Sequence, residues 1–139
     1  MIDIADFAPL RSTVMAGQAG EYLTSYILIR AGLQVVPVDV YGPDLWCRYP
    51  DKTVKTVEVK TATIATKQSK THTFPSYAFT LGDRSADLFA FVALDKERVL
   101  FKRPEDLPSY NTVRFYQTEF SLRNTQKSLG LILPEFEDY

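Results

Sequence analysis

The sequence has very few residues that could cross-link the chain or hold zinc. It contains one cysteine, Cys47, and one histidine, His72, in 139 residues. A single thiol excludes an intrachain disulfide, and no Cys/His cluster is available for a zinc site. We therefore interpret Cys47 as a core residue rather than a nucleophile, and we expect a reducing, cytoplasmic environment.

Long apolar runs are also missing. The longest runs, such as Leu88–Leu94, have the length of a buried strand and fall far short of the ~20 residues that a membrane helix requires. Asp3 and Asp6 lie where a secretory signal carries Lys or Arg. These features predict a soluble intracellular protein without a membrane partner. The length and the 45% of hydrophobic residues fit one globular domain over residues 1–139.

Strong charge of one sign is absent as well, since the formal net charge is −1. This balance argues against a protein coated with nucleic-acid contacts. The charge is uneven, however, because residues 48–72 contain six Lys or Arg and only two acids. Such a stretch is either a solvated face or a local binding patch, and composition alone does not decide between them.

Helical periodicity is clearest near the start of the chain. Apolar residues recur at three- and four-residue spacing over residues 12–31, and Gly32 follows where a left-handed C-terminal cap is expected. Gly17 and Gly20 lie inside the pattern, and each costs up to ~1 kcal/mol relative to alanine. They indicate either close backbone packing near the first turns or a helix that begins later.

The middle of the chain reads as strands. Two hairpins are predicted, the first turned at Pro50-Asp51-Lys52 and the second at Asp95-Lys96-Glu97. A short strand, a helical turn and a final strand and helix complete the order. The expected strands are 33–40, 45–49, 55–61, 76–81, 88–94, 98–102 and one within 111–120; the helical turn is 104–107 and the last helix lies within 122–133. This order predicts an α/β fold, or an α+β fold with its sheet built from the middle of the chain.

Aromatic residues are frequent at the predicted strand positions, where core packing is the default expectation. The predicted core aromatics are Phe74, Tyr77, Phe79, Phe89, Phe91 and Phe101.

Two acids and a lysine form the combination most suggestive of chemistry. Asp44 lies in a Gly-Pro-Asp bend, and Glu58 and Lys60 share one face of the following hairpin arm. The hairpin is short enough for Asp44 and Glu58 to converge. Mg²⁺ in proteins usually takes one or two carboxylates, and a nearby ammonium can orient an attacking water. The alternatives are a turn cap at Asp44 and a surface ion pair between Glu58 and Lys60, worth at most ~1 kcal/mol.

At these residues the sequence resembles the PD-(D/E)xK nuclease superfamily. Pro43-Asp44 matches the first half of its motif and Glu58-Val59-Lys60 matches the second, while the helix before them contains Glu21. The later strands are similar to those of small intron-encoded homing endonucleases and Holliday junction resolvases. The resemblance implies a restriction-endonuclease-like core, with a central mixed sheet flanked by helices, and the activity of a metal-dependent endonuclease that hydrolyses DNA phosphodiester bonds.

The resemblance also implies roles for individual residues. Asp44, Glu58 and the backbone carbonyl of Val59 would bind Mg²⁺, or Mn²⁺ in its place. Lys60 would position or activate water, and Glu21 would reach the site from the helix, unless its side chain is solvent-exposed.

The loop after Lys60 is expected to contact DNA through Lys67, Lys70 and His72. Because the net charge is modest, the basic patch is expected to be doubled in a homodimer or higher homo-oligomer. Two alternatives remain: a catalytically inactive nuclease fold that only binds DNA or a protein, and a structural protein with a fortuitous motif. The last predicts carboxylates more than about 8 Å apart, too far to share one Mg²⁺.

Overall fold

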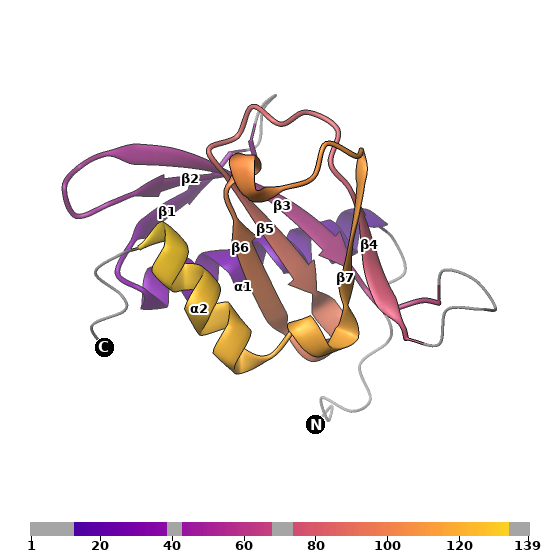
Figure 1. Cartoon of the computed structure of the whole chain (residues 1–139). Helices are drawn as coiled ribbons and strands as arrows, with labels where there is room; N and C mark the ends of the chain where they lie inside the picture. Colours follow the sequence, from indigo (N-terminus) through magenta and orange to yellow (C-terminus); the bar gives the residue numbers. More distant parts are fainter. Residues whose placement is uncertain (1–12, 39–42, 68–73, 134–139) are drawn as a thin grey trace, which may run out of the picture.

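The fold was determined as a computed structural model and is described for residues 13–38, 43–67 and 74–133 (Figure 1). Two α-helices, seven strands and three short 3-10 turns follow one another in these ranges. In chain order they are α1 (Thr13–Arg30), β1 (Gln34–Pro37), β2 (Leu45–Arg48), β3 (Val54–Ala62), β4 (Ser76–Thr80), β5 (Leu88–Ala93), η2 (Leu94–Lys96), β6 (Arg98–Lys102), η3 (Pro104–Asp106), β7 (Thr112–Tyr116), η4 (Gln117–Glu119) and α2 (Leu122–Ile132). Each element predicted from the sequence is present, with ends that differ by a few residues.

Helix α1 ends in a glycine cap, as its sequence predicts. Gly32 has a φ of +100°, which favours a residue without a Cβ. The amide of Leu33 donates to the Leu28 carbonyl at 3.1 Å, and the amide of Gly32 donates to the Ile29 carbonyl at 2.9 Å. This is the Schellman pattern. Leu28 and Leu33 are both buried, so the cap also turns the chain into the core.

The main sheet has five strands in the order β1-β2-β3-β5-β6. β1, β2 and β3 form an antiparallel meander, and β5 pairs with β6 in the second predicted hairpin. β3 and β5 are parallel, so the sheet is mixed. The connection between them passes through β4, which pairs with β7 in a separate two-stranded sheet.

The two faces of the main sheet are covered differently. On one face α1 packs over a core that includes Leu28, Val57 and Val92, and α2 contributes Leu129 to the same cluster. On the other face the β4–β7 sheet covers β5 and β6, where Phe89, Phe91 and Leu100 pack with Tyr77, Phe79, Val113 and Phe115. The mixed α/β architecture predicted from the sequence is confirmed, and the second sheet forms an additional layer.

Helix α2 protects one edge of the main sheet. β6 is an edge strand, and its outward backbone groups would be unpaired without a partner. Thr125 Oγ1 donates to the Val99 carbonyl at 2.8 Å, and the Phe101 amide donates to Ser128 Oγ at 3.1 Å. Both side chains are about 95% buried. The small polar residues in α2 therefore replace a neighbouring strand.

The prediction that Phe74 belongs to the core is wrong. Phe74 is 71% exposed because it precedes β4 and does not enter the β4–β7 layer. The other five predicted core aromatics are buried, and so is Cys47. Within the described ranges, no helix combines the length and the apolar character needed to cross a membrane.

Candidate active site

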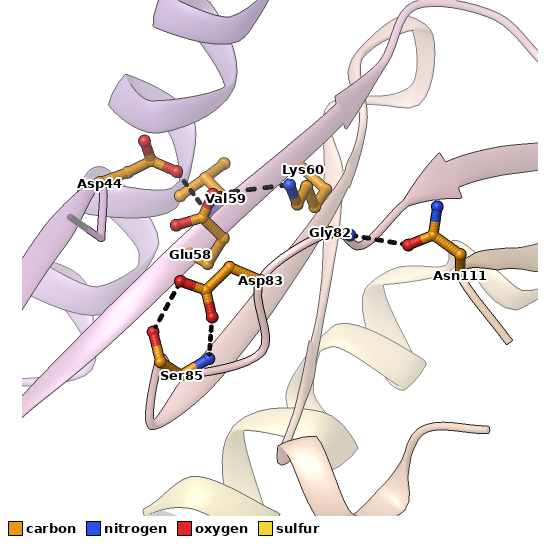
Figure 2. Close-up of polar contacts among 8 residues, drawn as sticks. All are labelled: Asp44, Glu58, Val59, Lys60, Gly82, Asp83, Ser85 and Asn111. Carbon is orange, nitrogen blue, oxygen red and sulfur yellow. Dashed lines mark hydrogen bonds and ion pairs between the residues drawn. The ribbon is translucent and has the colours of Figure 1, made fainter. Parts of the chain in front are cut away.

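Asp44 lies where β2 begins and directly contacts β3. The last paired residues of the two strands are Leu45 and Val57, so Asp44 stands opposite Glu58 at the open end of this ladder. The Val59 amide donates to Asp44 Oδ2 at 2.8 Å (Figure 2). This bond fixes the carboxylate beside β3 through Oδ2, and Oδ1 takes no part in it. The short hairpin therefore brings Asp44 and Glu58 together.

Glu58 and Lys60 project from the same side of β3 and pair with each other. Lys60 Nζ is 3.5 Å from Glu58 Oε1, and about a quarter of each side chain is exposed. The two neighbouring residues on β5 in the same register are Phe89 and Phe91, both fully buried. Glu58 and Lys60 therefore lie at the rim of the aromatic core, where water still reaches them.

The environment of Glu58 disfavours its negative charge. Burial raises the pKa of the Glu58 carboxyl, and the charge of Asp44 raises it further, while Lys60 opposes both effects. Asp83 adds a smaller contribution in the same direction as Asp44. Acids crowded in a partly desolvated place are stabilised when a cation is bound among them.

Asp83 is a site neighbour that the sequence analysis missed. It lies in the loop between β4 and β5, and its carboxylate stands beside Glu58 in Figure 2. The carboxylate also accepts from the amide and the hydroxyl of Ser85, at 2.9 and 3.1 Å. A Gly-Asp pair directly after a predicted strand was the available signal, although nothing local links it to a residue 25 positions earlier.

The loop that contains Asp83 is held by the segment before β7. Asn111 accepts from the Gly82 amide through Oδ1 at 3.1 Å and from the Leu81 amide through its carbonyl at 2.8 Å. The Arg84 guanidinium donates to the carbonyls of Pro108 and Tyr110. Gly82 has a φ of +59°, so the turn favours glycine. These contacts fix the backbone on both sides of Asp83.

Glu21 follows the residue at which α1 contacts β3. The preceding residue, Gly20, packs so closely on β3 that an added Cβ would lie 1.9 Å from Thr61 Oγ1. This contact confirms the predicted close backbone packing at Gly20, but not at Gly17, where an added Cβ would meet nothing within 4 Å. The Glu21 side chain is half-buried. Its participation in the site stays a prediction.

The predicted DNA contacts are described only in part. Lys67 is exposed, one residue after Thr66, which bridges to Ser76 of β4. Lys70 and His72 lie outside the described residues. Their contribution therefore stays a prediction.

The oxygen donors at this site fit a divalent cation such as Mg²⁺. The amide and the carbonyl of a strand residue point to the same side, so the Val59 carbonyl faces Asp44, as its amide does. If the β2–β3 register is extended, Pro43 stands opposite Val59, and proline has no N–H to donate to that carbonyl. No group of three or more His, Cys, Asp or Glu side chains suited to a metal occurs within the described ranges. Magnesium requires only one or two carboxylates, with waters as further ligands.

The comparisons with known proteins support the fold. No protein-family model matches the chain, and no curated protein matches its sequence. Among solved structures, the chain is similar to a bacterial homing endonuclease, I-Ssp6803I, with a TM-score of 0.64 over 93% of this chain and 96% of that one. The sequence identity is 18%. The chain therefore shares the fold of a bacterial homing endonuclease over nearly its whole length.

Proposed function

We propose that this protein is a metal-dependent endonuclease that hydrolyses phosphodiester bonds in DNA. The observation that carries the proposal is the meeting of Asp44, Glu58 and Lys60 at the open end of the β2–β3 ladder. The similarity to a homing endonuclease supports it, because the same residues match a nuclease motif in a fold known from a nuclease.

In this proposal Asp44, Glu58 and the Val59 carbonyl hold Mg²⁺. The bound cation would neutralise charge on the phosphate and lower the pKa of a bound water. Asp44 is held in place by the Val59 amide, so it needs little reorganisation. Lys60, 3.5 Å from Glu58, is close enough to the same oxygens to orient the attacking water and to stabilise the negative charge that develops.

The test is Mg²⁺- or Mn²⁺-dependent cleavage of a panel of duplex, branched and single-stranded DNAs. Asp44→Asn, Glu58→Gln and Lys60→Ala are each expected to reduce cleavage by ~10²-fold or more. Glu105→Gln and Lys127→Ala are matched controls, because both residues are exposed and belong to η3 and α2, which contribute no residue to the candidate site. Isothermal titration gives a second readout, in which Asp44→Asn weakens Mg²⁺ binding and Glu105→Gln does not.

Cleavage that persists in the Glu58 and Lys60 variants would contradict the proposed mechanism. DNA binding without cleavage of any substrate, together with an absence of Mg²⁺ binding, would instead favour an inactive nuclease fold that acts as a binding module.

We also propose that the protein is a homo-oligomer that associates through the outer face of α1. Tyr22, Tyr26 and Ile29 form a stripe on this face and are 64%, 56% and 54% exposed. The face opposite to them carries the buried residues Gly20, Thr24 and Leu28 of α1. A helix that is apolar on both faces is typical of burial on both. A two-fold contact uses the same patch on each copy. The three residues of the stripe are uncharged, and the Arg30 guanidinium borders the stripe, 5.7 Å from the Tyr26 ring centroid and donating to the Tyr26 hydroxyl at 2.9 Å.

Sedimentation of the wild type and of Ile29→Glu tests this association. The variant is expected to sediment as a monomer, because a charge would be desolvated in the contact. Leu131→Glu, at an exposed apolar position on α2, is the matched control and is expected to keep the wild-type mass. A monomeric wild type at micromolar concentration would refute the association.

A further inference from the structure

Among the residues that the structure describes, nothing covers one half of the main sheet on the side of the candidate active site. In antiparallel strands, residues that stand opposite each other project from the same face. Trp46 pairs with Thr56, and Thr56 lies two residues before Glu58, so Trp46 and Glu58 share one face. Trp46 is 50% exposed, because the β4–β7 layer packs over β5 and β6 and does not reach β2.

The uncovered face consists of successive cross-strand rows. The first row contains Asp44 and Glu58, at the candidate active site. The second contains Val36, Trp46 and Thr56, and the third contains Gln34, Arg48 and Val54. Val36 is 57% exposed and Val54 is 54% exposed, so the second and the third row both present apolar atoms to solvent.

Arg48 contributes a positive charge in the third row, whereas the Asp87 carboxylate lies beside the second row and accepts from the Thr56 hydroxyl at 3.1 Å. Arg48 lies four residues along β2 from Asp44, which corresponds to roughly 13 Å on an extended strand. Its side chain is exposed, and it forms no ion pair with any other residue in the described part of the chain. An exposed guanidinium two residues along the strand from an exposed indole fits a nucleic-acid strand, since arginine binds phosphate and an aromatic ring contacts sugar or base.

We propose that the substrate DNA strand leaves the active site over β2, with its backbone bound by Arg48 and with Trp46 against a sugar or base. The inference rests on the proposed function, because it assumes that the DNA strand is bound at the Asp44–Glu58 end of the same face. A second copy of this chain is the rival occupant. Helix α1, whose outer stripe is proposed for self-association, packs on the opposite face of the sheet, so both surfaces can be occupied together.

Binding assays can test the sheet face separately from catalysis. Trp46 is the only tryptophan, so its emission reports on this face alone. A short mixed-sequence duplex, added to the full-length protein in EDTA and then in Ca²⁺, is expected to reduce the Trp46 emission. In fluorescence anisotropy, Arg48→Ala is expected to lower the slope of log K against log salt by about 0.9, the contribution of one phosphate contact. Arg123→Ala removes the same charge from the exposed face of α2 and serves as the matched control.

Trp46→Thr is expected to weaken DNA binding while keeping the strand, because threonine favours extended backbone. Circular dichroism confirms the fold of each variant. Three results would overturn the inference: unchanged Trp46 emission in DNA-bound protein, equal salt slopes for the Arg48 and Arg123 variants, or a dimer lost in Trp46→Thr without a change in DNA affinity. None of these results bears on metal-dependent cleavage by Glu58 and Lys60, and a failure of cleavage leaves the binding result interpretable.

Discussion

The two halves of the five-stranded sheet serve different purposes. β5 and β6 lie between helices on one face and the β4–β7 sheet on the other, and all six residues of β5 are buried. In the described part of the chain, β1 and β2 are covered on one face only, and β3 lies at the boundary with Glu58 and Lys60 on its open side. Stability is thus concentrated in the covered half. The open half leaves Trp46 and Arg48 exposed, and the proposed DNA contact uses these two residues.

Deleting a side chain in the covered half should have the largest effect. Phe91 is fully buried and packs against Phe79 and Phe115, with ring centroids 5.0 Å apart in each pair. Phe91→Ala is expected to lower the free energy of unfolding by about 3–5 kcal/mol. Trp46→Thr, in the open half, should cost less than about 1 kcal/mol. Urea denaturation of both variants measures the contrast, and equal losses would mean that the two halves do not differ.

Gly20→Ala tests how tightly α1 is pressed on β3, the boundary strand. The new methyl group would overlap Thr61 Oγ1, so the helix or the strand must shift. Overpacking of this kind costs about 1–3 kcal/mol. Gly17→Ala is the matched control in the same helix, because nothing lies within 4 Å of its added Cβ. Alanine at that position should stabilise the protein by up to ~1 kcal/mol, so thermal melts of the two variants should shift in opposite directions.

Magnesium should raise the melting temperature of the protein by binding at the edge of the open half. A ligand that binds only the folded state adds RT ln(1 + [L]/Kd), about 1.4 kcal/mol at ten times Kd. The melting temperature of the wild type should therefore rise with Mg²⁺ and return to its starting value with EDTA. Asp44→Asn should respond little, whereas Glu105→Gln should respond like the wild type. An equal response in all three proteins would indicate nonspecific ion binding.

The pH dependence of Glu58 gives the smallest expected effect, because Lys60 partly offsets the causes that raise its pKa. A carboxyl whose pKa is raised by folding stabilises the folded state below its unfolded pKa, and that contribution is lost as the pH rises through the folded pKa. In EDTA at neutral pH, Glu58→Gln should therefore melt at a higher temperature than the wild type. The difference should shrink as the pH falls through the raised folded-state pKa and should be lost below 4.5, the ordinary value for glutamate. A variant that is less stable at neutral pH would mean that the ion pair with Lys60 dominates.

Local signals explain why much of this fold could be predicted from the sequence. The Gly32 cap and the two hairpins depend on residues close together in the chain, so turn residues and periodicity are sufficient to find them. The hairpin also brings Asp44 opposite Glu58. The two acids of the candidate site are therefore brought together by residues that are close in the sequence. The roles of these residues in catalysis remain predictions.

Distant contacts account for what the sequence did not reveal. β4 pairs with β7 across more than 30 residues, and no short pattern encodes that pairing. The position of Asp83 depends on Asn111, which lies in another loop. Phe74 was expected in the core because it is aromatic and close to a strand, but the layer formed by β4 and β7 leaves it outside. Each of these features follows from the tertiary arrangement rather than from local propensity.

The bonds between α2 and the edge of β6 have a consequence for biosynthesis. Thr125 and Ser128 belong to the last helix, so β6 is translated well before the side chains that cover its backbone. Until α2 docks, a strand rich in apolar residues presents free amides and carbonyls to other nascent chains. At the opposite edge, β1 is short and contains Pro37, which cannot donate to an added strand. Aggregation during synthesis is therefore expected at β6, and a chain truncated before α2 should be recovered mainly as insoluble protein.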